Sequence, residues 1–232
     1  MHDVSDYRSC FSRVLQICGQ QGADTVVFSM WSYDNTHTQL THGDVFADAT
    51  SVQMVLLECC NLRSRNECKT LVWRRERDNP QILYQRFARA VEPQGYIRAF
   101  LGDFESRRFG RDFVMLCGES NIVKIRMGTG LVSDEFGFLM RLEETGVVVI
   151  LNPVHDYMVR HEMKKKRAAL SSRNRWVLSV WNMGKKSATG KMIAEAHEPW
   201  TAFYNGEEVT KRIQEVKTAI PSVRLGVIEI TL

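Results

Sequence analysis

The residue of this sequence best suited to chemistry is Cys117, which lies near the end of an apolar run, Arg111 to Gly118. This run is typical of a buried strand, and the segment Glu119 to Met127 after it could begin a helix. At such a junction the first backbone N–H groups of the helix favour both a thiolate and an oxyanion. An ordinary thiol, with a pKa of about 8.5, is mostly protonated at neutral pH and needs such help to act as a nucleophile.

Each of the other reactive side chains, and Cys117 itself, also has a simpler interpretation. Cys117 could be a small buried residue, since cysteine is among the most buried residue types. His155 follows an apolar run, where a histidine more often caps a helix or bonds within a loop than takes part in catalysis. Cys59, Cys60 and Cys68 have no histidine nearby and lack the spacing of zinc ligands. We therefore expect no metal site and no cofactor.

The elements that must position Cys117 alternate between helical and extended patterns. Residues Asp3 to Gln20 repeat apolar positions at steps of three and four, which predicts an amphipathic helix. Short runs rich in β-branched residues predict strands, some of them buried on both faces. These runs are Ala23–Met30, Val52–Cys60, Lys69–Trp73, Ile82–Phe87, Thr145–Leu151, Trp176–Trp181, Thr201–Tyr204 and Leu225–Leu232.

Two more helices and a hairpin complete the pattern. Asp156 to Ser171 has helical spacing, a helix is expected near Glu208 to Thr218, and Asn205-Gly206 is a hairpin signal. This alternation predicts an α/β fold in which helices pack against sheets. With 232 residues, 44% of them hydrophobic, and no linker or repeat, the chain is expected to form one domain over residues 1–232.

Charge and composition narrow the range of partners and locations. The formal net charge of +4 comes from local clusters of arginine and lysine, not from a dense basic face with interleaved aromatic residues, so nucleic acid is not an expected partner. No apolar run reaches the roughly 18 residues that span a bilayer, and the first ten residues lack an export signal. We expect a soluble cytoplasmic protein without a membrane partner, in which most of the six cysteines are free thiols.

Three segments, taken in order, resemble the signatures of the nitrilase (carbon-nitrogen hydrolase) superfamily. Gly22 to Met30 (GADTVVFSM) is similar to the family phrase G-A-D-hydrophobic-F-P-E after the opening helix. Tyr84-Gln85-Arg86 resembles the Tyr-x-Lys at the end of a strand, and Leu116 to Glu119 (LCGE) contains the Cys-x-Glu motif. Segments further along the chain also resemble the family, namely Val147–Pro153, Lys165–Ala168, Trp176–Asn182, Trp200–Val209 and Leu225–Leu232.

The resemblance covers nearly the whole chain and implies a nitrilase-like αββα sandwich that forms a homodimer. The family normally begins with a strand before the first helix, whereas little precedes Asp3 here. We therefore expect the sheet to lack an edge strand.

The resemblance also implies a set of site residues, two of which are altered. The family uses a glutamate as general base, a lysine that stabilises the tetrahedral intermediate, and a cysteine nucleophile. These positions fall on Met30, Arg86 and Cys117. Methionine accepts no proton, and arginine keeps the charge in a different geometry. A relocated carboxylate could replace the base, and Glu119 is preferred among Asp34, Glu58, Glu92 and Glu119. The residues expected to bind substrate are Asn152, His155 and Trp181.

Two functions of different classes follow from these residues. The first is a divergent amidase or nitrilase that acts on a small amide, nitrile or carbamoyl compound through Cys117, with Arg86 and Glu119 as helpers. The second is a catalytically silent nitrilase-like module used for binding or assembly, because Met30 and Arg86 depart from the family pattern.

Overall fold

A computed structural model describes most of the chain: residues 4–30, 40–47, 49–60, 68–88, 94–126, 128–154, 161–181, 198–220 and 223–231. None of the helices within these ranges is both long and apolar enough to cross a membrane.

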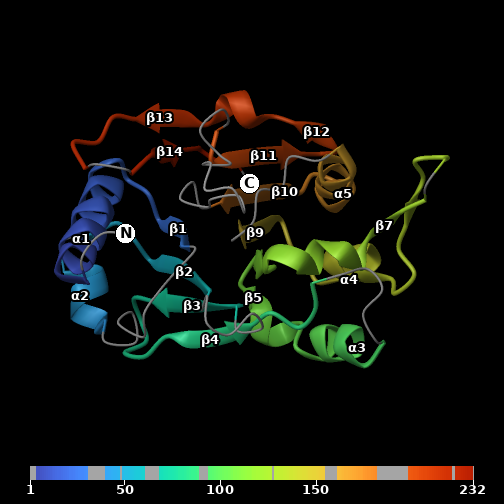
Figure 1. Cartoon of the computed structure of the whole chain (residues 1–232), viewed down its shortest axis with the longest axis horizontal. Helices are drawn as coiled ribbons and strands as arrows, with labels where there is room; N and C mark the ends of the chain where they lie inside the picture. Colours follow the sequence, from blue (N-terminus) through green and yellow to red (C-terminus); the bar gives the residue numbers. More distant parts are fainter. Residues whose placement is uncertain are drawn as a thin grey trace, which may run out of the picture.

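The first half of the chain forms a four-stranded sheet with two helices beside it (Figure 1). The strands are β1 (Thr25–Met30), β2 (Met54–Cys60), β3 (Cys68–Arg74) and β4 (Gln81–Tyr84), and the helices are α1 (Val4–Gln20) and α2 (His42–Phe46). β1 and β2 are parallel, whereas the β2–β3 and β3–β4 pairs are antiparallel. Phe11, Leu15 and Cys18 form the buried stripe of α1 and pack in one cluster with Val55 and Leu57 of β2.

The second half forms a six-stranded sheet in the order β12-β11-β10-β9-β6-β5. Its strands are β5 (Arg108–Phe109), β6 (Asp112–Val114), β9 (Val149–Val154), β10 (Trp176–Trp181), β11 (Trp200–Tyr204) and β12 (Glu207–Glu208). β6, β9 and β10 are mutually parallel. The helices α3 (Gln94–Gly102), α4 (Phe138–Glu144) and α5 (His161–Leu170) pack on one face of this sheet through a cluster that includes Phe100, Phe138, Ile150 and Val177.

A third cluster joins the two sheets. It includes Leu56 and Val72 from the first sheet with Leu151 and Trp176 from the second. Alternate residues of β2 therefore face different clusters, since Leu56 faces the second sheet while Leu57 faces the helices. The remaining short elements are η2 (Glu105–Arg107), η3 (Cys117–Ile122), η4 (Thr210–Arg212), the pair β7 (Lys124–Ile125) and β8 (Val132–Ser133), and the pair β13 (Gln214–Val216) and β14 (Leu225–Val227).

The α/β class is confirmed, and the predicted strands and first helix lie within a few residues of their expected positions. The helix predicted near Glu208 to Thr218 is wrong, because that segment forms η4 and then β13, which pairs with β14. This pairing brings the chain very close at Gly226, where a Cβ would lie 2.6 Å from Cγ2 of Ile213. Tertiary pairing overrides the local helical pattern here.

Several of the cysteines are free, as expected from the sequence. Cys18, Cys59 and Cys117 are free thiols, whereas Cys68 is disulfide-bonded, which the sequence did not predict. Burial raises the pKa of Cys18 to about 11 and also raises the pKa of Cys59. These two thiols are therefore poor nucleophiles at neutral pH.

Asp112 makes the stability of the fold depend on pH. Burial, assisted by the negative charge of Asp24 and opposed by Arg111, raises its pKa from 3.8 to about 6. The folded state then binds this proton more tightly than the unfolded state, so the stabilisation is complete below about pH 4 and is lost as the pH rises through 6.

We expect Asp112→Asn to stabilise the protein by about 2 kcal/mol above pH 6 and to have little effect at pH 4, because asparagine carries no charge to bury. Urea unfolding of the variant and the wild type at pH 4 and pH 7.5 measures this difference. An equal difference at both pH values would contradict the prediction.

Candidate functional site

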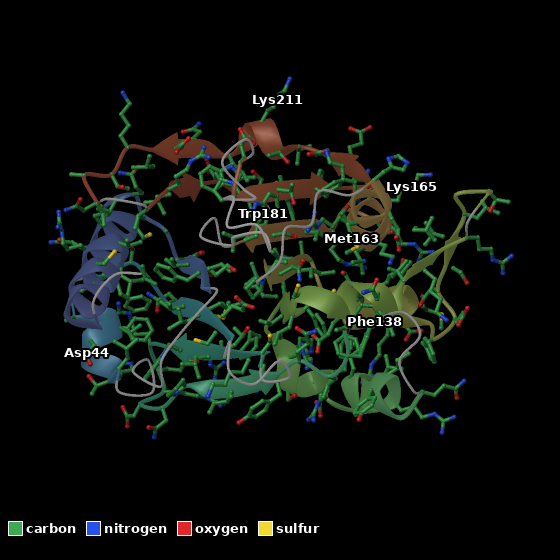
Figure 2. All side chains as sticks on the ribbon, in the orientation of Figure 1. Asp44, Phe138, Met163, Lys165, Trp181 and Lys211 are labelled. Atoms are coloured by element: carbon green, nitrogen blue, oxygen red, sulfur yellow. The ribbon has the colours of Figure 1, made fainter. Side chains whose placement is uncertain are left out.

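The carboxyl ends of the parallel strands converge on Cys117. This residue begins η3 directly after the β6 segment and is 4% exposed. It packs in one cluster with Val154 at the end of β9, Trp181 at the end of β10, and Met163 of α5. Figure 2 shows Met163 next to α5 and Trp181 next to the strands of the second sheet. Ligands of open α/β sheets bind outside this edge, which makes Cys117 a candidate site residue.

A buried positive charge lies beside Cys117. Arg167 lies one helical turn after Met163 on the same face of α5, and it is 1% exposed. Its guanidinium carbon is 5.8 Å from the centre of the Trp181 ring. Burial lowers the pKa of Arg167 to about 10, and attraction to Cys117 and Glu208 opposes that decrease. The guanidinium therefore lies in the same buried region as the Cys117 cluster.

Glu119 fixes the backbone on which Cys117 lies. Nη1 and Nη2 of Arg107 donate hydrogen bonds of 2.8 Å and 3.0 Å to its carboxylate. The backbone N–H groups of Leu116 and Arg86 each donate another, at 2.8 Å. Burial raises the pKa of Glu119, while Arg107 and the two backbone donors oppose that rise. Four donors occupy this carboxylate, so its observed role is to hold the turn around Cys117.

Two further contacts hold the same turn from other sides. Gly118 lies against Ala88, whose Cα would be only 2.5 Å from a Cβ at position 118, so any larger residue would displace the backbone. Asn121 donates to the carbonyl of Ala88 and accepts a 2.5 Å hydrogen bond from Nζ of the buried Lys166. Because Lys166 and Arg167 are neighbours on α5, this contact also fixes Arg167 relative to Cys117.

Arg86 contacts Glu119 through its backbone N–H group, and its side chain points elsewhere. Its Nε donates a 2.5 Å hydrogen bond to Asp103, and its side chain is 41% exposed. The guanidinium is thus part of a surface ion pair, whereas Cys117 is buried.

The residues expected to bind substrate have different positions. Trp181 contributes to the cluster around Cys117. Asn152 of β9 is buried; it donates to the carbonyl of Met115, the residue after β6, at 2.6 Å and accepts from Ser179 of β10 at 3.0 Å. His155, together with the alternative bases Asp34 and Glu92, lies outside the described residues. Met30 ends β1, and its side chain is also outside the described part.

A second buried carboxyl lies at the same edge of the first sheet. Glu58 of β2 is 1% exposed and is the register partner of Ser29 in β1. Oγ of Ser29 lies 3.1 Å from Oε2 of Glu58 and 2.5 Å from the carbonyl oxygen of Val154. Val154 therefore connects the two groups, because its side chain packs against Cys117 while its carbonyl contacts Ser29.

Sequence reasoning missed two residues of this site, Arg167 and Ser29. The signal for Arg167 was its spacing of four residues from Met163, which places both on one face of a helix. No local signal identifies Ser29, since its importance comes from its pairing with Glu58.

The likeness of this chain to known proteins is weak. No protein-family model matches the chain, and no curated protein matches it. One similar solved structure is the glutamine-dependent NAD+ synthetase from Acinetobacter baumannii in complex with adenosine diphosphate, with 12% sequence identity and a TM-score of 0.49. The match covers 89% of this chain and 40% of that one, so this chain spans less than half of the synthetase chain.

The buried pair of Arg107 and Glu119 gives a prediction about stability. Glu119→Gln leaves the guanidinium of Arg107 buried without its counter-charge, so we expect a loss of about 3–5 kcal/mol in the free energy of unfolding. Urea unfolding at pH 7.5 measures this loss. Arg86→Met is the control, because it removes only a surface ion pair and is expected to cost less than about 1 kcal/mol. Equal losses in the two variants would show that the buried pair has no special role.

Proposed function

We propose that this chain is a divergent carbon-nitrogen hydrolase in which the sulfur of Cys117 attacks a small amide, nitrile or carbamoyl compound. The observation that carries the proposal is the position of Cys117 at the carboxyl ends of β6, β9 and β10, in one buried cluster with Met163 and Trp181, with the buried Arg167 on the same face of α5 as Met163. A cation in a dry site favours the thiolate over the thiol, and the same cation can stabilise the oxyanion that forms on attack.

The arrangement of the layers supports the same proposal. Helices α1 and α2 pack on the first sheet, α3 to α5 pack on the second, and an apolar cluster joins the sheets. We interpret this arrangement as a nitrilase-like αββα sandwich. The homodimer and the cytoplasmic location implied by the resemblance belong to this proposal, and light scattering of the purified chain tests the dimer.

Each neighbour of Cys117 has a part in the proposed reaction. Arg167 replaces the family lysine as the cation, in place of Arg86. Met163 and Trp181 keep water away from the sulfur, which strengthens the attraction between Arg167 and a developing negative charge. Glu119 is a positioning residue, since its hydrogen bonds to Arg107 and Leu116 hold the turn that presents Cys117.

A second candidate function is a silent binding or assembly module. The observation that favours it is the packing of Cys117 among Val154, Met163 and Trp181, which also suits a cysteine that only fills space. In this case the thiol would have no special reactivity.

Alkylation by iodoacetamide distinguishes the two candidates through the dependence of its rate on pH. We expect Cys117 to react at neutral pH faster than the buried Cys59, and Arg167→Met to shift the midpoint of its rate curve upward by about 1–3 pH units. Mass spectrometry of each cysteine peptide measures these rates. Arg167→Lys is the matched control, because it retains the charge and should retain most of the reactivity. A curve for Arg167→Met identical to that of the wild type would contradict the proposed role of Arg167.

Turnover of small amides tests the chemistry directly. We expect a panel of aliphatic amides, carbamoyl compounds and nitriles to contain at least one that releases ammonia, and Cys117→Ala to abolish this release because the covalent step is lost. Release of ammonia is followed with a coupled enzyme assay, and Cys10→Ala serves as the control. Equal turnover by Cys117→Ala and the wild type would exclude Cys117 as the nucleophile.

A further inference from the structure

Cys68 is disulfide-bonded, and the other cysteines restrict what its partner can be. Three of the six cysteines are free thiols, namely Cys18, Cys59 and Cys117. The candidates for the partner of Cys68 are therefore Cys10 and Cys60.

The two faces of β3 exclude Cys10 as the partner. Side chains alternate along a strand, so Cys68 lies on the same face of β3 as Val72, four residues later. Val72 belongs to the cluster between the two sheets, whereas Cys10 packs against the cluster of α1 that contains Leu71. Cys10 and Cys68 therefore lie on opposite faces of the first sheet.

The register of β2 and β3 places the backbone of Cys60 directly opposite that of Cys68. Pairs in an antiparallel ladder alternate between hydrogen-bonded and non-hydrogen-bonded. The N–H of Arg75 donates to the carbonyl oxygen of Gln53 at 2.9 Å, so this pair is hydrogen-bonded. Cys60 lies an odd number of steps along β2 from Gln53, which makes its pair with Cys68 non-hydrogen-bonded. The Cα atoms of such a pair are about 4.5 Å apart, within the range of about 4.4–6.8 Å that a disulfide spans.

We propose that Cys60 and Cys68 form a reversible cross-strand disulfide whose reduction loosens the turn that carries Cys117. In the reducing compartment proposed for this chain, a disulfide is typically transient and responds to the redox state. A dithiol reduces it in two exchanges: one thiolate attacks a sulfur of the bridge, and the second displaces the mixed disulfide that results. The dithiol becomes a disulfide, and its two protons pass to the two cysteine thiols. Neither the bridge nor its effect on the turn depends on the proposed hydrolase chemistry.

One backbone hydrogen bond connects Cys68 to the strand end that holds the turn of Cys117. The carbonyl oxygen of Cys68 accepts from the N–H of Gln85 at 3.0 Å. The neighbours of Gln85 contact the buried arginine–glutamate pair through their backbone, Tyr84 by its carbonyl oxygen and Arg86 by its N–H group. A bridge that fixes Cys68 to β2 therefore also limits the movement of this end of β4.

Mass spectrometry tests the pairing in protein that is equilibrated with oxidised glutathione and then alkylated in denaturant. We expect the fragment spectra of the wild type to show Cys68 linked to Cys60, and Cys60→Ser to leave Cys68 open to alkylation. Cys59→Ser is the matched control, because it removes the adjacent cysteine of β2 and should leave Cys68 blocked. Alkylation of Cys68 in the wild type, or a link from Cys68 to another cysteine, would overturn the inference.

Hydrogen exchange tests the effect of the bridge on the turn of Cys117. The amides to follow are those of Arg86 and Leu116, since both donate to the buried carboxylate. We expect them to exchange about tenfold faster in dithiothreitol than in oxidised glutathione, because the loosened strand end opens more often. Cys60→Ser should exchange at the faster rate in both conditions, whereas Cys59→Ser should behave as the wild type.

The outcomes separate this inference from the proposed function. Exchange at Arg86 and Leu116 that reduction leaves unchanged, or unfolding of the whole chain on reduction, would overturn the link between the bridge and the turn. If Cys60→Ser does not fold, the wild type in the two redox conditions provides the same comparison. A Cys117 without reactivity would overturn the proposed function and leave the bridge and its effect on exchange intact.

Discussion

The structure around Cys117 depends on the buried ion pair between Arg107 and Glu119. One arginine binds both carboxylate oxygens and the carbonyl oxygen of Tyr84 at the end of β4, so it joins the two sheets at the point where the turn begins. A buried pair of this kind gains little over apolar packing, but loss of one partner leaves an uncompensated charge. Its value here is geometric, because the carboxylate also fixes the backbone of Leu116 and Arg86. The turn that presents Cys117 therefore cannot move independently of β4.

The same part of the molecule contains a second cation, which has a different role. The charge of Arg107 is neutralised by Glu119, whereas the guanidinium of Arg167 lies over the ring of Trp181, which packs with Cys117. The guanidinium of Arg86 pairs with Asp103 at the surface, so it does not belong to the buried cluster around Cys117. The buried guanidinium nearest to that cluster's tryptophan is on α5.

The sequence predicted well those features that depend on local pattern. The apolar runs located the strands that end near Cys117 and Trp181, because burial on both faces requires continuous apolar residues. The role of Glu119 could not be predicted from local pattern. The sequence shows that Glu119 is two residues from Cys117, but not that Arg107 and other donors occupy its carboxylate oxygens. Arg167 was similarly hidden, because helical spacing defines a face of α5 but not what that face contacts.

The parallel register of β1 and β2 sets which side chains meet at the edge of the first sheet. In this register Met30 pairs with Cys59, and Ser29 pairs with Glu58. A carboxyl group on β2 therefore lies at the same edge of the sheet as one at the end of β1. Its alternation with Leu56 also directs it towards the second sheet. The hydroxyl of Ser29 donates to Glu58 at 3.1 Å, so the two strands are also joined by their side chains at this edge.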